Sequence, residues 1–282
     1  SLSLTNPWVL AVTLNDGGSI HGTNTIYWAY GAMSNNSRVR LEFTRNNGID
    51  WSLIVSNLLI SSTGYAWDVS GELLPSSYCR WRVISESYAS VSDEVDTVFG
   101  IKNQPLTIFV NDTNTLGDMY CSAPGNPANS GLASNVPLDD PSAAIRKYYD
   151  IISGDDTIYI DTGFYVLTNS IGLGERIFGA SGHVIRVKGS TNAAYGGTLI
   201  HRNDPAGIGF ELSGTRWVDV DHIRLTGAGT GMQISDSGNC SLDWVECLSN
   251  AAGAFLVSQS DSIRFDRCLA WSNGGWGLTV SG

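Results

Sequence analysis

The chain has 282 residues, of which 16 are basic and 27 acidic, giving a net charge of −11. This charge argues against nucleic acid or an anionic membrane surface as a partner, and no apolar run approaches the roughly 18 residues of a membrane-spanning helix. Charged residues make up only 15% of the chain, and Gly, Ser, Thr and Asn are abundant. This composition indicates a β-rich extracellular or cell-surface protein rather than a cytosolic enzyme.

Residues 1–103 contain many short β-like segments, such as "TIYWAY", "RVRLEFT" and "CRWRVIS", separated by turn signals such as "NDGG", "RNNG" and "SSTG". This rhythm predicts an immunoglobulin-like or fibronectin-like β-sandwich. Trp28, Trp51, Trp67 and Trp81 lie on separate predicted strands, where core packing explains them. The alternative role for these tryptophans is an aromatic platform that binds sugars.

The sequence of this domain resembles that of bacterial Ig-like modules related to the yeast Kre9/KNH-type cell-wall domain, or of fibronectin III-like modules. The resemblance rests on Trp28 and on four segments, Val39–Trp51, Gly64–Val69, Tyr78–Ser87 and Val91–Ile101. These motifs are loose but span most of the domain. The resemblance implies a spacer or a surface-binding unit of a secreted protein.

A second domain is expected over residues 104–282, after a short Pro-containing linker at residues 102–106. Its helix is predicted at about 141–153, where Asp140 can cap the first turn and Pro141 suits the first helical position. Three apolar residues, Ile145, Tyr148 and Ile152, share one face of this helix. We expect the helix to cover the apolar side chains of the first coil of a repeat structure.

Residues 216–282 repeat a pattern of 22 or 23 residues in which apolar positions alternate with polar ones. The alternation is typical of strands and the long period is typical of a solenoid, so the segment predicts coils of a parallel β-helix. The expected interior columns are Val220, Leu242 and Phe265; Phe210, Met232, Phe255 and Leu278; and Ile200, Ile223, Val245 and Cys268.

The start of the second domain also resembles the N-terminal cap of secreted bacterial right-handed parallel β-helix proteins. These include a family of unknown function, NosD-like repeats and several polysaccharide lyases. The residues that match this cap are Gly125, Asn126, Gly131, Pro137, Ser142, Gly154, Asp155, Ile158, Tyr159, Gly163 and Tyr165. The resemblance implies an all-β chain: an Ig-like sandwich, a short capping helix and a right-handed parallel β-helix. It spans enzymes and non-enzymes, so it implies no single activity.

The five cysteines are an odd number, so at least one thiol is unpaired or pairs with another chain. Cys240, Cys247 and Cys268 occupy inward positions of the repeats, where they are expected to be small core residues. Cys79 and Cys121 lie outside the repeats, and a disulfide between them is the alternative to two free thiols.

The candidate catalytic residues are His201, Asp219, His222 and Arg224, with Arg202 close in sequence. They offer a base and cations, as a polysaccharide lyase requires, but no paired acids of the kind a glycoside hydrolase uses. The repeat places Arg224 next to Glu246 on the following coil, in an outward column that would also hold His201 and Leu269. A surface ion pair is the alternative explanation for Arg224.

An aspartate recurs at Asp221, Asp243 and Asp266, where each strand is expected to bend. Stacked carboxylates repel one another unless they cap backbone amides, remain solvated or bind a cation. Calcium is therefore the one cofactor that the sequence suggests, since its ligands are oxygens.

These observations predict a non-catalytic, extracellular or cell-surface segment of a larger bacterial protein with a structural or adhesive role. Its expected partners are polysaccharides or other surface components, further copies of itself, or further coils beyond Gly282. One alternative is a carbohydrate-active β-helix enzyme, either a polysaccharide lyase or a glycoside hydrolase. The other is a glycan-binding module that uses the Trp-rich sandwich.

Overall fold

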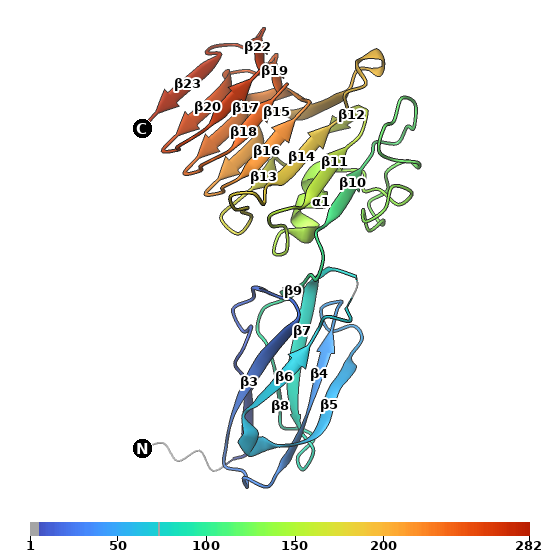
Figure 1. The fold of residues 1–282 in the computed structure, drawn as a ribbon, viewed down its shortest axis with the longest axis vertical. Helices are drawn as coiled ribbons and strands as arrows, with labels where there is room; N and C mark the ends of the chain where they lie inside the picture. Colours follow the sequence, from blue (N-terminus) through green and yellow to red (C-terminus); the bar gives the residue numbers. More distant parts are fainter. Residues whose placement is uncertain (1–5, 73) are drawn as a thin grey trace. The chain divides into compact units, whose positions relative to one another are not determined.

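The computed structural model describes residues 6–72 and 74–282, which divide into two compact units, Ser1–Gln104 and Pro105–Gly282 (Figure 1). The described residues are mostly strands, with a single α-helix, so the predicted all-β class is confirmed. No helix among them is long and apolar enough to cross a membrane.

The described strands of the first unit form two sheets. One contains β1 (Trp8–Ala11), β3 (Thr23–Gly31) and β6 (Gly64–Asp68). The other contains β2 (Ser19–Ile20), β9 (Phe99–Ile101), β7 (Ser76–Ser85), β4 (Arg38–Thr44) and β5 (Ser52–Leu59), with β8 (Ser92–Glu94) beside β7. Pairing is antiparallel except between β2 and β9. A short 3₁₀ helix, Ile60–Ser62, precedes β6.

Both sheets contribute side chains to one apolar core, in which Trp28, Trp67 and Trp81 are buried as predicted. Trp51 is different. It is half-buried outside this core, and the Arg82 guanidinium lies 3.9 Å from its ring centroid. Cys79 is buried in the core of the first unit, and both Cys79 and Cys121 are free thiols in this structure.

The second unit consists of parallel strands. One sheet has the order β10 (Thr107–Val110), β11 (Thr157–Ile160), β14 (Ile185–Gly189), β16 (Val218–Asp221), β18 (Ser241–Asp243) and β21 (Arg264–Asp266). The other contains β12 (Gly163–Val166), β15 (Thr198–Ser213), β17 (Ile223–Ser235), β19 (Glu246–Leu248) and β22 (Leu269–Trp271), extended by β13 (Ile171–Leu173), β20 (Gly253–Ser258) and β23 (Leu278–Ser281). Figure 1 shows these strands stacked side by side.

We call each passage of the chain through both sheets a coil. Two predicted columns are confirmed by strand register. Val220 pairs with Leu242 and Leu242 with Phe265, while Phe210, Met232, Phe255 and Leu278 pair in turn on neighbouring strands. Phe210 is fully buried, whereas Leu278 on the last strand is 52% exposed. Each coil therefore buries its apolar side chains against those of the next.

The predicted column that begins at Ile200 is wrong at its first member. Ile200 pairs with Leu225, and the neighbour of Ile223 is Thr198. Likewise His201 pairs with Thr226, not with Arg224. The cause is an irregular stretch of β15, in which the register shifts twice between His201 and Ile208. A constant repeat length cannot anticipate residues that are added inside a strand.

The helix α1 spans Pro141–Tyr148, so the prediction of a helix to residue 153 is wrong for its last turn. The carbonyl of Tyr148 accepts hydrogen bonds from both Ile151 and Ile152, and the chain leaves the helix there. The predicted cap is confirmed, because Asp140 Oδ1 accepts from the backbone N–H of Ser142 at 2.7 Å and of Ala143 at 3.1 Å. The helix contacts β10 and β13 and buries Ile145 in the shared core.

The loop between β10 and α1 is anchored by the buried carboxylate of Asp161. Its Oδ1 accepts from the backbone N–H of Met119 and Thr162, each at 2.7 Å. Its Oδ2 accepts from the N–H of Tyr120 at 2.7 Å and of Cys121 at 2.6 Å. Asp161 therefore holds residues 119–121 of this loop in place.

Asp118 in the same loop gives a pH prediction. Burial, with Asp161 and Asp112 nearby, raises the pKa of Asp118 from 3.8 to about 6 despite a hydrogen bond from Asn111. The pKa of Asp118 is higher in the folded chain than in the unfolded chain. The stabilising contribution of its protonated carboxyl is therefore present below pH 3.8 and is lost as the pH rises through about 6. We expect Asp118→Asn to stabilise the chain relative to wild type above pH 6.

Urea unfolding of wild type and Asp118→Asn across this pH range measures the effect. The difference in unfolding free energy should grow in favour of the variant as the pH rises. Asp16→Asn, at an exposed carboxylate of the first unit, is the matched control. A difference that is constant with pH would show that Asp118 titrates normally.

Candidate functional site

A groove of about 320 Å³ lies on the outside of the second unit. This volume falls within the usual range of small-ligand sites. The groove is lined by Ser190, Thr191, Ala193, Gly196, Gly197, Thr198, His222, Arg224, Trp244, Glu246, Arg267 and Leu269.

One side of the groove is a column of corner residues. His222 follows β16, Trp244 follows β18 and Arg267 follows β21, and each turns the chain towards the second sheet with a left-handed φ of 52°, 53° and 48°. Other corners of the unit use the same conformation, so it belongs to the fold. Glycine and asparagine adopt it at the lowest cost. His222, Trp244 and Arg267 differ from other left-handed corners, such as Trp217, because their side chains line the groove.

The three corner side chains stack on one another. The rings of His222 and Trp244 are 5.8 Å apart and inclined by 25°, and the guanidinium of Arg267 lies 5.1 Å from the Trp244 ring centroid. Trp244 remains 46% exposed despite these contacts. The column thus presents a partly exposed aromatic surface held by its neighbours.

The second row of the groove comes from outward positions of β17, β19 and β22. Arg224, Glu246 and Leu269 pair in register on these strands. Arg224 Nε donates to Glu246 Oε2 at 2.5 Å, and Trp271 Nε1 donates to Glu246 Oε1. The predicted Arg224–Glu246 ion pair is confirmed. The carboxylate of Glu246 is therefore held in place by two donors.

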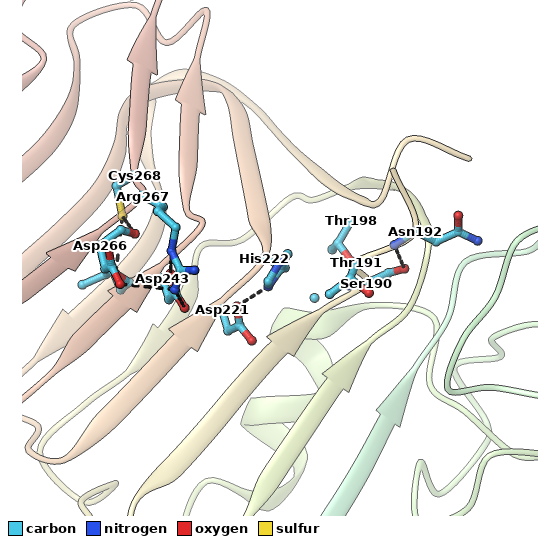
Figure 2. A network of polar contacts seen from close by, with 12 residues as sticks. Ser190, Thr191, Asn192, Thr198, Asp221, His222, Asp243, Asp266, Arg267 and Cys268 are labelled. Atoms are coloured by element: carbon cyan, nitrogen blue, oxygen red, sulfur yellow. Dashed lines mark hydrogen bonds and ion pairs between the residues drawn. The ribbon is translucent and has the colours of Figure 1, made fainter. Parts of the chain in front are cut away.

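The connection from β14 to β15, residues 190–197, projects over one end of these rows, and we call it the overhang. At the same corner in the next coil a single residue, His222, joins β16 to β17. The longer connection therefore stands above the level of the following corners. Figure 2 shows Ser190, Thr191 and Asn192 beside His222, with Arg267 on the far side of His222.

Each basic side chain of the groove already contacts a carboxylate. His222 Nδ1 bonds Asp221, and Arg224 pairs with Glu246. Arg267 donates from Nε to Asp243 at 3.0 Å and from Nη2 to Asp243 at 2.7 Å and to Asp266 at 3.2 Å (Figure 2). The groove is thus a surface of paired charges around an aromatic centre, without a cation left for an anionic ligand among the described lining residues.

The structure brings only two of the candidate catalytic residues together. His222 and Arg224 both line the groove. His201 lies in the Thr226 column and its ring is 5.9 Å from that of Phe164. Asp219 is on the other sheet, where it accepts from Ser241 Oγ at 2.9 Å. Arg202 pairs with Asp204 at 3.2 Å.

The recurring aspartates do lie in register, since Asp221 pairs with Asp243 and Asp243 with Asp266. Their carboxylates contact His222 and Arg267, and Asp266 also lies 3.8 Å from Arg264. The guanidinium groups of Arg264 and Arg267 thus offset the repulsion between Asp243 and Asp266. Among the described residues, no group of three or more His, Cys, Asp or Glu side chains is placed to hold a metal ion.

The central residues of the groove, Trp244 and Arg267, are absent from the sequence-based candidates. A signal for them exists: His222, Trp244 and Arg267 each follow one of the recurring aspartates. The same offset from a repeated residue places them in one column. Chemistry-bearing types at that offset, in three successive coils, could have marked the site.

In comparisons with known proteins, no protein-family model, no curated protein and no solved structure matches the chain.

Proposed function

We propose that the chain is a non-catalytic, extracellular or cell-surface adhesive segment that binds a neutral glycan in the groove beside Trp244. In this proposal the first unit is an Ig-like or fibronectin-like sandwich that acts as a spacer. The second is the capped start of a right-handed parallel β-helix that carries the binding surface. Its parallel sheets and in-register apolar columns support this assignment.

The observation that carries the proposal is the partly exposed indole of Trp244, which lies between His222 and Arg267 in the corner column and beside Arg224 and Glu246 of the second row. A pyranose ring has an apolar face of C–H groups and a rim of hydroxyls that both donate and accept. The part of the Trp244 indole that His222 and Arg267 leave exposed supplies apolar contact area for such a face. Glu246 offers carboxylate oxygens as acceptors, and Arg224 and Arg267 offer N–H donors around the same ring.

The charge pattern favours a neutral glycan over an acidic one. A uronic acid polymer would need a cation to neutralise each bound carboxylate, but Arg224 and Arg267 are already paired with Glu246, Asp243 and Asp266. Adding carboxylates to this acidic chain is unfavourable, since its net charge is −11. The same pairing disfavours the lyase alternative, whose substrate is an acidic polysaccharide.

The test is binding of the full chain to a panel of immobilised neutral and acidic oligosaccharides. Each oligosaccharide that binds is then titrated in solution, and calorimetry gives its affinity. We expect Trp244→Ala to weaken binding of the best neutral ligand by about 30-fold, the effect of removing a central aromatic contact of about 2 kcal/mol. Trp217→Ala is the matched control, because Trp217 also occupies a left-handed corner, with φ 59°, but does not line the groove.

Two results would contradict the proposal. One is an absence of binding to every glycan in the panel. The other is binding that Trp244→Ala leaves intact while a substitution at Trp51 removes it, which would move the site to the first unit. Incubating each bound glycan with the chain and assaying for newly formed reducing or unsaturated ends tests the enzyme alternative in the same experiment.

A further inference from the structure

We infer that the groove receives the end of a glycan chain rather than its interior, because the overhang closes the groove on one side. This inference rests on the proposed function and adds which part of a glycan chain occupies the groove. It follows from the position of the overhang relative to the lining residues along the stack of coils.

The two rows of the groove run across three successive coils. His222 and Arg224 lie on the first, Trp244 and Glu246 on the second, and Arg267 and Leu269 on the third. In the coil before His222, Lys188 pairs with Asp221 and Leu199 with Arg224. The chain between these two partners is the overhang, so the overhang stands where the rows would otherwise continue.

The overhang is tied down from both sides. Asn192 Nδ2 donates to the carbonyl of Gly117 at 2.7 Å, and Gly117 lies so close to the ring of Tyr195 that an added Cβ would be 2.4 Å from Tyr195 Cγ. Thr191 Oγ1 contacts Met119 Sδ at 3.4 Å. On the groove side, Arg224 Nη1 donates to the carbonyl of Gly196 at 3.3 Å.

These contacts hold the overhang in a fixed position, so it acts as a rigid wall of the groove. Its backbone is closed on itself as well, since Gly197 N–H donates to Asn192 O at 3.0 Å and Ser190 N–H to Thr198 Oγ1 at 2.7 Å. A glycan lying along the two rows therefore meets a fixed obstacle beyond His222. Its last ring stops there, and the rest of the chain extends past Trp244 towards Arg267.

The decisive measurement is the number of protein molecules bound per glycan chain, in a length series of the best neutral oligosaccharide from the panel. Binding to a chain end gives one protein molecule per chain at every length, because each chain has one end of the matching kind. Binding to the interior gives a number that rises with length. Calorimetry on wild-type protein provides this ratio without any variant.

A pair of neighbouring substitutions tests the wall itself. Ala193 lines the groove, whereas Ala194, the next residue of the same short 3₁₀ helix, is exposed but does not line it. We expect Ala193→Trp to weaken binding by about tenfold or more, because the indole fills the space of the terminal ring. Ala194→Trp should bind like wild type.

The outcomes separate this inference from the proposed function. A stoichiometry that rises with chain length, or equal affinities of the Ala193→Trp and Ala194→Trp variants, overturns end recognition while leaving glycan binding in place. No binding to any glycan overturns both. One protein molecule per chain, with loss of affinity only in Ala193→Trp, supports the inference.

Discussion

Replacing Asp161 with alanine is expected to lower the free energy of unfolding of the second unit by at least about 3 kcal/mol. The Asp161 carboxylate is fully buried and accepts four backbone N–H bonds, from Met119, Tyr120, Cys121 and Thr162. Hydrogen bonds to a charged group contribute about 1.5–3 kcal/mol each. The stated minimum counts only two of the four bonds, because donors near the exposed Met119 can turn to water.

The comparison of Asp161→Asn with Asp161→Ala sharpens this prediction. Asparagine keeps one acceptor oxygen, so two of the four donors retain a partner, and we expect a smaller loss than for alanine. Asp261→Ala is the control, since Asp261 is an exposed partner of Arg216. Chemical unfolding gives the free energies, and hydrogen exchange read peptide by peptide assigns the change to residues 105–282. Equal stability of Asp161→Ala and wild type would contradict the anchoring role.

The same variant should also affect the groove. Residues 117–119, which Asp161 helps to fix, hold the overhang through Gly117 and Met119. Loosening this support should increase hydrogen exchange in residues 190–197 as well as in the loop itself. An effect confined to the loop would show that the overhang is held by its own internal hydrogen bonds.

Replacing Phe210 with alanine is expected to destabilise the second unit by about 3–5 kcal/mol, the usual cost of truncating a buried phenylalanine. Phe210 is fully buried and lies in a column between Ile171 on one side and Met232 and Phe255 on the other. Phe164→Ala, at a side chain that is 53% exposed in the same unit, should cost far less. Chemical unfolding of both variants measures the difference. Similar losses at the two positions would contradict the interior column.

Phe210 and Asp161 show what the sequence could and could not predict. The Phe210 column follows from a regular spacing of apolar residues, because buried positions one coil apart must match. Asp161 has no such signature: an aspartate after a strand is equally compatible with an exposed turn. Its role depends on a loop more than 40 positions earlier in the chain, and only the folded path brings the two together.

The candidate site is likewise predictable only where its residues follow the regular spacing of the repeat. His222 and Arg224 lie in the regular repeat and were recognised, whereas His201 was misplaced because β15 contains irregularities that a fixed period cannot include. Trp244 is marked in the sequence only by its place after Asp243, which matches that of His222 after Asp221. The overhang gives the groove its end wall, and its length could be read from the sequence only after the flanking strands were known.

The most direct test of the account is a crystal structure of the full chain with the best-binding neutral oligosaccharide. We expect a sugar ring against the indole of Trp244, hydroxyls bonded to Glu246 and Arg224, and the terminal ring against the overhang. A glycan bound instead beside Trp51 of the first unit, or elsewhere on the second unit away from Trp244, would contradict it.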